Sequence, residues 1–303
     1  MEKMSRRTAV LISNPNAGRG GEQRALSVKR FCELLKAHGV DAELLNTTRP
    51  GDATQMAESA AQNGVREVIV SGGDGTINEA LQGLIGTGAR LGIWPCGTAN
   101  VLARELDLPF GAEEAAEVIA RGKQRRIHIG CAINERTGER RYFLLMAGVG
   151  LDASIVRRVR PRLKRRVGEV AFWYSGLEHL AGWQPVPFHV EVDGQTFPAT
   201  FAAIGNAAHY GGNLAITPRA RLDQPEFEIC IINSRSRIRY LYLLSRAMRG
   251  GVKANMPGVR FIRATHARAT GDVLVQADGE LIGQLPMTFE IAPHPIEIIT
   301  QEK

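Results

Sequence analysis

The chain has 303 residues, 44% of them hydrophobic, and a formal net charge of +7 with a pI near 9.5. That length suits about two domains, each with its own core. No stretch reaches the roughly 18 to 20 uninterrupted apolar residues that a membrane-spanning helix needs, and the 4 cysteines have no metal-ligand or disulfide spacing. Met1 leads into a strand pattern without a secretory segment, so the sequence predicts a cytoplasmic protein.

Strand and helix patterns alternate in the first part of the chain. Short apolar runs predict strands at 8–13, 41–46, 66–71 and 90–94. Helical stretches lie between them, near 21–38, 52–63 and 76–86. This alternation is typical of an α/β domain in which helices cover a parallel sheet.

The run Val68–Glu79 joins an apolar strand to a helix through a glycine-rich turn. Gly72, Gly73 and Gly75 lack a Cβ atom, so their backbone can approach a ligand closely, and the free N–H groups at the start of the helix favour an anion. Asp74 supplies a carboxylate where a magnesium ion bound to a phosphate would need one. The run therefore predicts a site for a phosphate and its metal.

The same run has a plainer interpretation. Thr76 and Glu79 match the Thr-x-x-Glu capping box, in which two side chains satisfy backbone donors of the first helical turn. The glycines would then serve only as a tight turn between strand and helix. The spacing matches neither the Walker loop nor the dinucleotide-binding Gly-x-Gly-x-x-Gly pattern, which excludes those two kinds of nucleotide site.

Beyond about residue 125 the pattern changes to segments of alternating polarity, separated by Gly, Pro and Asp turns. They lie at 140–146, 188–193, 196–204, 226–232, 258–266, 273–277, 287–291 and 295–300. Two helical stretches lie near 154–182 and 237–249. The second part of the chain is therefore expected to consist mostly of antiparallel β-sheet.

A basic block concentrates the positive charge, with seven cations in the ten residues from Arg157 to Arg166. Aromatic and aliphatic side chains follow between Phe172 and Trp183. Residues 157–183 therefore predict a surface that meets an anionic membrane. The alternative is a solvated helix face whose aromatic side packs on the core. No nucleic-acid-binding module accompanies the block, so no nucleic-acid partner is expected.

Several ordered motifs resemble one family. Gly72-Gly-Asp-Gly-Thr-x-Asn-Glu79 and Pro95-x-Gly-Thr-Ala-Asn100 are similar to the catalytic domain of diacylglycerol kinases and sphingosine kinases, close to the bacterial soluble lipid kinases. The resemblance continues through Asn14-Pro-Asn-Ala-Gly18, Gly148-Val-Gly-Leu-Asp152, Gly205-Asn-x4-Gly-Gly212 and Asp278-Gly-Glu280. It implies an α/β nucleotide-binding domain at 1–125, a mostly antiparallel β domain for the acceptor at 126–293, and a C-terminal strand at 294–303 that returns to the first domain.

The resemblance implies ATP as the phosphate donor, magnesium as its metal and a membrane lipid hydroxyl as the acceptor. Diacylglycerol, giving phosphatidic acid, is the first expectation for that lipid. Family contacts to the nucleotide carry over to Asn14, Gly18, Thr47, Gly72, Gly73, Asp74, Gly75, Thr76, Asn78 and Thr98. Among these, Asp74 is expected to bind magnesium directly or through water.

On the acceptor side, Glu280 matches the family position that takes the proton from the lipid hydroxyl, with Asp278 in support. A carboxylate is chemically adequate, because phosphoryl transfer depends mainly on positioning and charge neutralisation. A lone Asp-Gly sequence is otherwise typical of a hairpin turn. Asp152 is a further candidate for contact with the acceptor, and a helix cap is its alternative role.

Two positions depart from the family pattern. Val101 stands where bacterial relatives often carry an Asp, so the site would depend more heavily on Asp74. Gln224-Pro225 stands where relatives have an Asp-Gly turn that holds a structural magnesium. Asp223 and Glu226 are the acids left there to bind a second cation.

The motifs leave the acceptor open. A kinase of sphingosine or ceramide shares them, and a soluble NAD kinase shares the Gly-Gly-Asp-Gly sequence. The two departures also leave room for a catalytically silent, membrane-associated nucleotide-binding protein. We expect a cytoplasmic enzyme associated peripherally with the membrane, and the oligomeric state stays open, with a dimer as one option.

Overall fold

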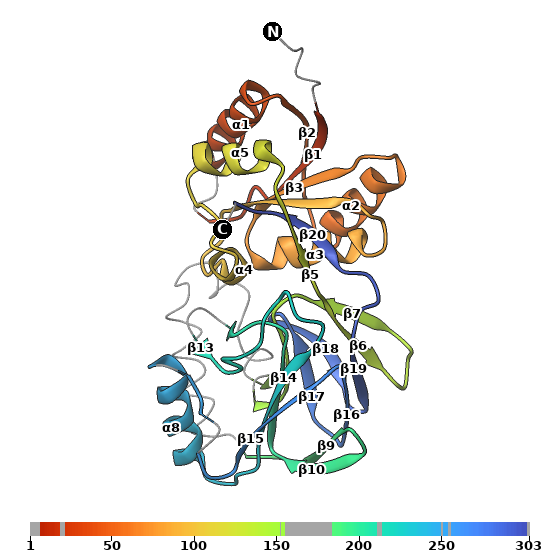
Figure 1. Ribbon diagram of the computed structural model, residues 1–303, viewed down its shortest axis with the longest axis vertical. Coiled ribbons are helices and arrows are strands. Elements are labelled where there is room, and N and C mark those ends of the chain that lie inside the picture. Colours follow the sequence, from red (N-terminus) through yellow and green to blue (C-terminus); the bar gives the residue numbers. More distant parts are fainter. Residues whose placement is uncertain are drawn as a thin grey trace. The chain divides into compact units, whose positions relative to one another are not determined.

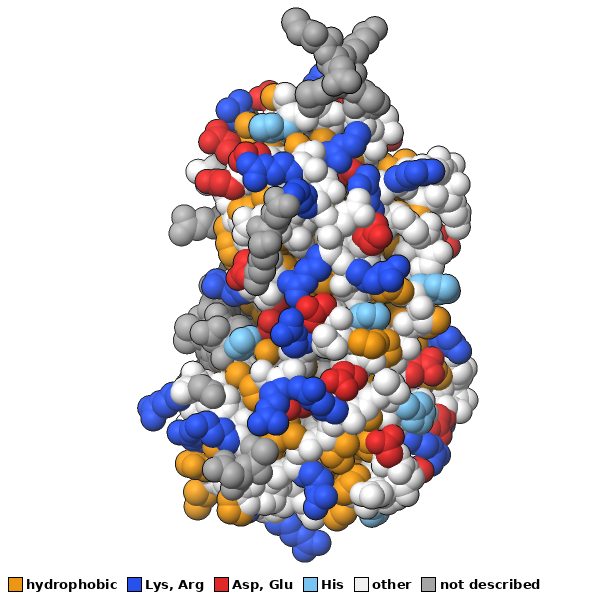
Figure 2. All heavy atoms as spheres, viewed as in Figure 1, with side chains coloured by type: hydrophobic (Ala, Val, Ile, Leu, Met, Phe, Trp, Pro, Cys, Tyr) orange, Lys and Arg blue, Asp and Glu red, His pale blue; other side chains and the backbone are white. Residues whose placement is uncertain are grey.

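The computed structural model describes residues 7–18, 22–151, 153–154, 184–210, 214–249, 251–253 and 256–301. The chain divides into two units, Met1–Ile127 with His294–Lys303, and His128–Pro293. Lys and Arg side chains are spread over both units on the face drawn in Figure 2, in line with the net charge of +7. No helix in these described ranges is long and apolar enough to cross a membrane.

The first unit alternates strands and helices. Its elements are β1 (Arg7–Ser13), α1 (Glu22–Ala37), β2 (Val40–Asn46), α2 (Asp52–Gln62), β3 (Glu67–Gly72), α3 (Asp74–Leu84), β4 (Arg90–Pro95), α4 (Val101–Glu105), α5 (Ala112–Arg121), β5 (Gln124–Ile127) and β20 (Ile296–Ile299). The strands form one sheet in the order β2-β1-β3-β4-β20-β5, parallel except for the β20–β5 pair (Figure 1). The predicted α/β domain with a parallel sheet is confirmed.

Helices cover both faces of this sheet. Helices α1 and α5 pack side by side on one face, and α2 and α3 pack together on the other (Figure 1). On the α1 side, Phe31 stacks on Trp94 with ring centroids 4.2 Å apart. On the other side, Gly83 lets α3 approach α2, because a Cβ atom there would lie 2.3 Å from the Thr54 carbonyl oxygen. The fully buried strand β3 runs between these layers and ends in the glycine-rich turn.

The second unit consists mainly of antiparallel strands. They are β6 (Gly130–Asn134), β7 (Arg140–Phe143), β8 (Met146–Gly150), β9 (Phe188–Val192), β10 (Gln195–Ala199), β11 (Phe201–Gly205), β12 (His209–Tyr210), β13 (Leu214–Ala215), β14 (Phe227–Ile232), β15 (Val259–Ala264), β16 (His266–Thr270), β17 (Leu274–Ala277), β18 (Glu280–Gln284) and β19 (Met287–Ile291). Helix α8 (Arg237–Met248) connects β14 to β15. The β-rich second domain expected from the sequence is confirmed.

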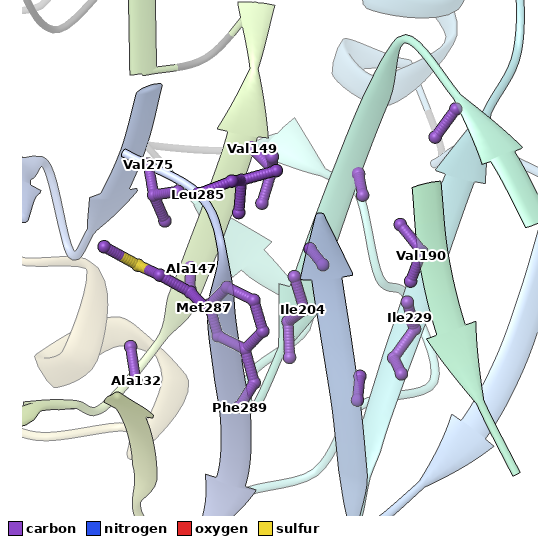
Figure 3. Packing of buried hydrophobic residues seen from close by; sticks show 14 of the residues in the cluster. Ala132, Ala147, Val149, Val190, Ile204, Ile229, Val275, Leu285, Met287 and Phe289 are labelled. Atoms are coloured by element: carbon purple, nitrogen blue, oxygen red, sulfur yellow. The ribbon is translucent and has the colours of Figure 1, made fainter. Parts of the chain in front are cut away.

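Two six-stranded sheets form a sandwich in this unit, in the orders β10-β9-β16-β19-β6-β7 and β15-β14-β11-β8-β17-β18. One buried cluster draws side chains from both sheets. Figure 3 shows Met287 and Phe289 from the first sheet together with Val149, Ile204 and Val275 from the second. Alternate residues of each strand supply this core, which explains the alternating polarity of the sequence.

Three segments predicted as single strands are each divided into two. The segment 140–146 breaks between β7 and β8, 196–204 breaks at Thr200, and 258–266 breaks at Thr265. At all three breaks the chain passes from one sheet to the other. The run stays apolar through such a corner because both strands face the same core, so alternation alone does not reveal the break.

The capping-box interpretation of Thr76 and Glu79 is wrong. Helix α3 begins at Asp74, with Gly73 as its N-cap, so Thr76 already lies in the first helical turn. The Glu79 carboxylate accepts a hydrogen bond from the Gly51 N–H, at 3.1 Å, in the loop before α2. Glu79 thus links two neighbouring helices instead of closing its own.

Candidate functional site

The strand order of the first unit creates a topological switch point between β1 and β3, at the carboxyl ends of these strands. From β1, the chain builds outward to β2 on one side and to β3 and β4 on the other. In open parallel sheets, ligands bind outside the carboxyl ends of the strands at such a point. The segments after β1, β3 and β4 begin with Asn14, Gly73 and Cys96. All three segments therefore lie at the carboxyl ends of the strands, where a nucleotide is expected.

The loops after β3 and β4 touch through glycines. A Cβ atom on Gly97 would lie 2.5 Å from the Gly73 Cα atom, and one on Gly72 would lie 2.7 Å from the Thr76 Cβ atom. Neither position has room for a side chain. By contrast, a Cβ atom on Gly75 would have no atom within 4 Å. Gly73 and Gly97 thus let the two loop backbones touch, Gly72 leaves room for the Thr76 side chain, and Gly75 borders open space.

Asp74 joins the two loops through its side chain. Its carboxylate oxygens accept hydrogen bonds from the N–H groups of Val101, at 3.1 Å, and Leu102, at 3.2 Å, at the start of α4. Burial raises the pKa of Asp74, and these amide donors partly oppose that rise. Val101 itself is buried. The apolar residue found in place of the family acid therefore contributes its backbone N–H to the site.

Asn100 holds the second loop in shape. It adopts the left-handed conformation, with φ of 47°. Its side-chain oxygen accepts from the Gly97 N–H, and its amide nitrogen donates to the Gly97 carbonyl, both at 2.8 Å. Thr98 lies between these two residues with an exposed side chain. The loop therefore presents Thr98 to solvent at the carboxyl ends of the strands.

The segment after β1 lies against the glycine-rich turn. The Asn14 N–H donates to the Ser71 carbonyl, and the Asn14 side-chain amide donates to the Thr76 hydroxyl, both at 3.1 Å. Gly18 has φ of +65°, and a Cβ atom there would lie 2.6 Å from the Cys96 carbonyl oxygen. Asn14, Gly18 and Thr76, predicted from distant motifs, are thus brought together.

Thr47 and Asn78 are buried near the carboxyl ends of the strands. The Thr47 N–H donates to the Ser13 carbonyl at 2.9 Å, which fixes it beside the end of β1. The Asn78 side-chain oxygen accepts from the Gln82 amide at 3.2 Å along α3. Both residues support the elements that carry the loops.

Arg24 is a buried residue of this site that the sequence analysis did not single out. From α1 it donates to the Ser71 carbonyl at 3.0 Å, the Ser71 hydroxyl at 2.7 Å and the Cys96 sulfur at 3.1 Å. Its guanidinium also stacks over Trp94, 5.1 Å from the ring centroid. One cation thus braces the ends of β3 and β4 directly before the two glycine loops.

In the second unit, the Asp278-Gly279 pair forms a tight hairpin turn between β17 and β18, with φ of 46° and 83°. The Asp278 carboxylate accepts three backbone hydrogen bonds, from Leu144 at 2.6 Å, Leu145 at 2.9 Å and Met146 at 3.0 Å. These amides lie where the chain crosses from β7 to β8. Asp278 therefore fixes the turn that presents Glu280.

Glu280 follows this turn, with 45% of its side chain exposed, and forms an ion pair with Arg141. It lines a groove of about 390 Å³ together with Asn134, Glu139, Arg141 and Leu281, among others. The Arg141 contact sets the direction of the Glu280 carboxylate. The groove thus combines a charged pair with apolar wall residues.

The residues around Asp223 do not fit a structural cation. Asp223 is paired with Arg221 through two contacts, at 3.0 and 3.1 Å, and Glu226 is paired with Arg263 at 3.0 Å. Arginines already neutralise both acids that were expected to compensate for the missing Asp-Gly turn. Within the described residues, no group of three or more His, Cys, Asp or Glu side chains gathers as a metal centre.

Asp74 fits a magnesium ion that arrives with a nucleotide. Its carboxylate accepts hydrogen bonds from the N–H groups of Val101 and Leu102, and an ionised carboxylate offers about four acceptor sites. Magnesium commonly uses one or two carboxylates together with substrate phosphates and water. Asp152 and the basic block 157–183 lie outside the described residues.

Comparisons with known proteins agree over nearly the full chain. Residues 8–132 match the diacylglycerol kinase catalytic domain, and residues 146–300 match the YegS C-terminal NAD kinase beta sandwich-like domain. The chain is 30% identical over 293 residues to a diacylglycerol kinase of Mycobacterium tuberculosis (strain ATCC 25618 / H37Rv), covering 95% of this chain and 93% of the relative. It is also 30% identical over 301 residues to a diacylglycerol kinase of Staphylococcus carnosus, covering 97% and 95%.

Solved structures share the fold. Two crystal structures from Bacillus anthracis match with TM-scores of 0.80 and 0.75, at 24% and 23% identity, and each match covers 97% of both chains. The motifs predicted from the sequence lie inside both matched domains. The chain therefore belongs to the diacylglycerol kinase family.

Proposed function

We propose that this protein is an ATP- and Mg²⁺-dependent lipid kinase that transfers the γ-phosphate to the hydroxyl of diacylglycerol and produces phosphatidic acid. The observation that carries the proposal is the glycine-rich turn at the switch point, where a desolvated carboxylate, Asp74, opens a helix. Relatives named diacylglycerol kinase support the choice of acceptor. The cytoplasmic, peripherally membrane-associated location expected from the sequence is part of the same proposal.

For the donor, the N–H groups at the start of α3 and the Thr76 hydroxyl would bind the ATP phosphates. The open space beside Gly75 would admit them. Asn14, Gly18, Thr47 and Thr98 would line the rest of the nucleotide site. Asp74 would hold magnesium, which neutralises charge on the phosphates during transfer.

For the acceptor, Glu280 would take the proton of the lipid hydroxyl. The hydroxyl oxygen bonds to the γ-phosphorus while the bond from that phosphorus to the β,γ-bridging oxygen breaks, and ADP leaves with that electron pair. Asp278 acts as a positioning residue, because its three backbone contacts hold the turn before Glu280. No step is assigned to a second cation near Asp223.

The test is phosphorylation with labelled ATP, Mg²⁺ and mixed micelles that contain one acceptor at a time: diacylglycerol, sphingosine or ceramide, with NAD in a separate soluble assay. We expect labelled phosphatidic acid from diacylglycerol alone. Glu280→Gln should lower turnover by about a hundredfold or more. Glu139→Gln, in the same groove, is the matched control and should keep wild-type turnover.

Each alternative has its own outcome in this assay. Preference for sphingosine or ceramide would replace the diacylglycerol assignment with a long-chain-base kinase. Labelled NADP would indicate a soluble NAD kinase. Nucleotide binding without any labelled product would indicate a catalytically silent protein.

A further inference from the structure

We propose that the outer side of helix α8 is a docking surface for an anionic lipid bilayer. The surface consists of Ile238, Leu241, Tyr242 and Met248, with Arg235 and Arg249 at its two ends. It lies outside the segment 157–183 and takes no part in the proposed chemistry. The proposal rests on the membrane association that is part of the proposed function, and it names a surface that would meet the bilayer.

Large apolar side chains on α8 face solvent. Ile238 is 79% exposed, Tyr242 55%, Met248 51% and Leu241 42%. In the rest of the described chain, exposed large hydrophobic residues lie singly in separate segments: Leu26, Phe110, Val186 and Leu281. Single exposed apolar residues are normal, but a cluster on one short helix indicates a binding surface.

The opposite side of α8 is anchored to the second unit. Tyr240, Leu243 and Ala247 are buried. The Tyr240 hydroxyl lies 2.6 Å from the Thr200 hydroxyl, and burial raises the pKa of Tyr240 to about 12. Because the core already receives this side of the helix, the helical repeat leaves Ile238 and Tyr242 pointing away from it. The exposed side chains therefore do not contribute to the core of the second unit.

The stretch of sequence that contains α8 carries formal charge of one sign. No Asp or Glu occurs between Glu228 and Asp272, whereas that stretch holds eight arginines and one lysine. Arg235, Arg237 and Arg249 are exposed beside the apolar cluster. Figure 2 shows hydrophobic and basic side chains side by side at the lower left, where Figure 1 places α8. Such a combination is the signature of a helix that lies in a membrane interface.

Charge complementarity selects an anionic bilayer over a second copy of the chain. A two-fold contact through this surface would bring the same arginines of both copies together, which repels. Nucleic acid would pair with the arginines but would leave Ile238, Leu241 and Met248 in water. A bilayer with anionic headgroups can bind both the arginines and the apolar side chains, since it has negative charge at its surface and apolar chains beneath it. At 12 residues α8 would lie flat in this interface.

Vesicle sedimentation of the full chain tests this proposal without any need for turnover. The vesicles are phosphatidylcholine alone or phosphatidylcholine mixed with phosphatidylglycerol. We expect binding of the wild type to rise with phosphatidylglycerol. Arg235→Gln with Arg249→Gln should lower the partition coefficient by about 25-fold on anionic vesicles, at about fivefold per arginine. Ile238→Ser with Leu241→Ser should lower it by about tenfold.

The matched control is Leu26→Ser with Lys29→Gln, which makes the same kinds of change at exposed positions of α1. It should bind as the wild type does, and all variants should keep the wild-type unfolding temperature. Equal binding by the α8 variants and the wild type would overturn the proposal, as would a wild type that ignores phosphatidylglycerol. A drop in self-association of the α8 variants, with vesicle binding unchanged, would assign the surface to a second copy instead.

Discussion

Two Asp-Gly sequences in this chain use the aspartate side chain in the same way but in different settings. Asp74 opens a helix and accepts the first two N–H groups of α4, and Asp278 lies in a hairpin turn and accepts the N–H groups of 144–146. In both, the carboxylate fixes a segment that is distant in the sequence. The dipeptide alone therefore does not tell which aspartate serves chemistry.

The two aspartates differ in the burial of the carboxyl group and in the lengths of its hydrogen bonds. The Asp74 carboxylate accepts from the Val101 and Leu102 N–H groups at 3.1 and 3.2 Å, and burial raises the pKa of this carboxyl although these and the Asn100 and Asp74 backbone amides oppose the rise. Asp278 takes three N–H groups, two of them on one oxygen, at 2.6 to 3.0 Å. Asp74 thus carries a desolvated charge held by longer hydrogen bonds, whereas the shorter hydrogen bonds of Asp278 fix the backbone of 144–146. Substitution at the two positions should separate catalysis from stability.

The largest effect is expected for Asp74→Asn. The amide keeps the size of the side chain but loses the charge that would hold magnesium, so turnover should fall by about a thousandfold. At about pH 4 the unfolding free energy should change little. Kinetics over a range of Mg²⁺ concentrations, beside urea unfolding, measure both effects. Asp41→Asn, on the exposed side of β2, is the control. Full activity of Asp74→Asn would contradict the assigned role.

Asp278→Asn should do the opposite. It weakens three charge-assisted hydrogen bonds at a sheet-to-sheet crossing, so the unfolding free energy should fall by about 3 kcal/mol. Activity at low temperature should fall much less than for Asp74→Asn. Urea unfolding and turnover measured on the same samples give the comparison. Unchanged stability together with lost turnover would mean that Asp278 acts on the substrate directly.

Arg24→Met should give an intermediate effect in the first unit. The variant keeps packing volume under Trp94 but removes all three hydrogen bonds to Ser71 and Cys96, which should cost about 2 kcal/mol of stability. The KM for ATP should rise because the ends of β3 and β4 lose their brace. Arg30→Met, exposed on the same helix, should stay within about 0.5 kcal/mol of the wild type. A stable Arg24→Met variant with unchanged KM would remove Arg24 from the site.

Two glycine variants test the proposed phosphate-binding role of the glycine-rich turn. Gly97→Ala places a Cβ atom 2.5 Å from the Gly73 Cα atom, so it should cost about 1 to 2 kcal/mol of stability and also raise the KM for ATP. Gly75→Ala meets no atom within 4 Å, so stability should be kept. If phosphates occupy that space, Gly75→Ala still raises the KM for ATP. An unchanged KM in Gly75→Ala would place the phosphates elsewhere.

The smallest effect concerns pH. Burial raises the folded-state pKa of Asp74 above its unfolded value. The contribution of this group to stability is therefore fully present below the unfolded pKa, near about 4, and is lost as pH rises through the folded pKa. Asp74→Asn should accordingly gain stability relative to the wild type as pH increases from about 4. Urea unfolding over a pH series measures the trend, and a constant difference would contradict it.

Much of the fold could be predicted because its signals are local. The apolar runs of β1, β3 and β4 and the helical repeat of α8 depend only on neighbours in the sequence. The corners at Thr200 and Thr265 could not, because both flanking strands face one core and the apolar pattern continues through the turn. Their positions are set by how the two sheets pack.

In the candidate site, too, the features with local sequence signals could be predicted and those that join distant segments could not. The glycine-rich turn was predictable from residue types, but the contacts of Asp74 with α4 join segments that are distant in the chain. Arg24 could have been predicted from one feature of the sequence, because it precedes Val28, Phe31 and Leu35 on the buried face of α1. An arginine at a core position of a helix requires a polar partner inside the protein. Here that partner is Ser71, at the end of β3 directly before the glycine-rich turn.

Strand β20 lies between β4 and β5 in the sheet of the first unit, yet it follows the whole second unit in the chain. During synthesis, β1 to β5 leave the ribosome long before their missing neighbour does. The sheet of the first unit therefore stays open, with a gap beside β4, until the second unit has been made. The order of translation thus makes the proposed phosphate-binding half the last part of the enzyme to be completed.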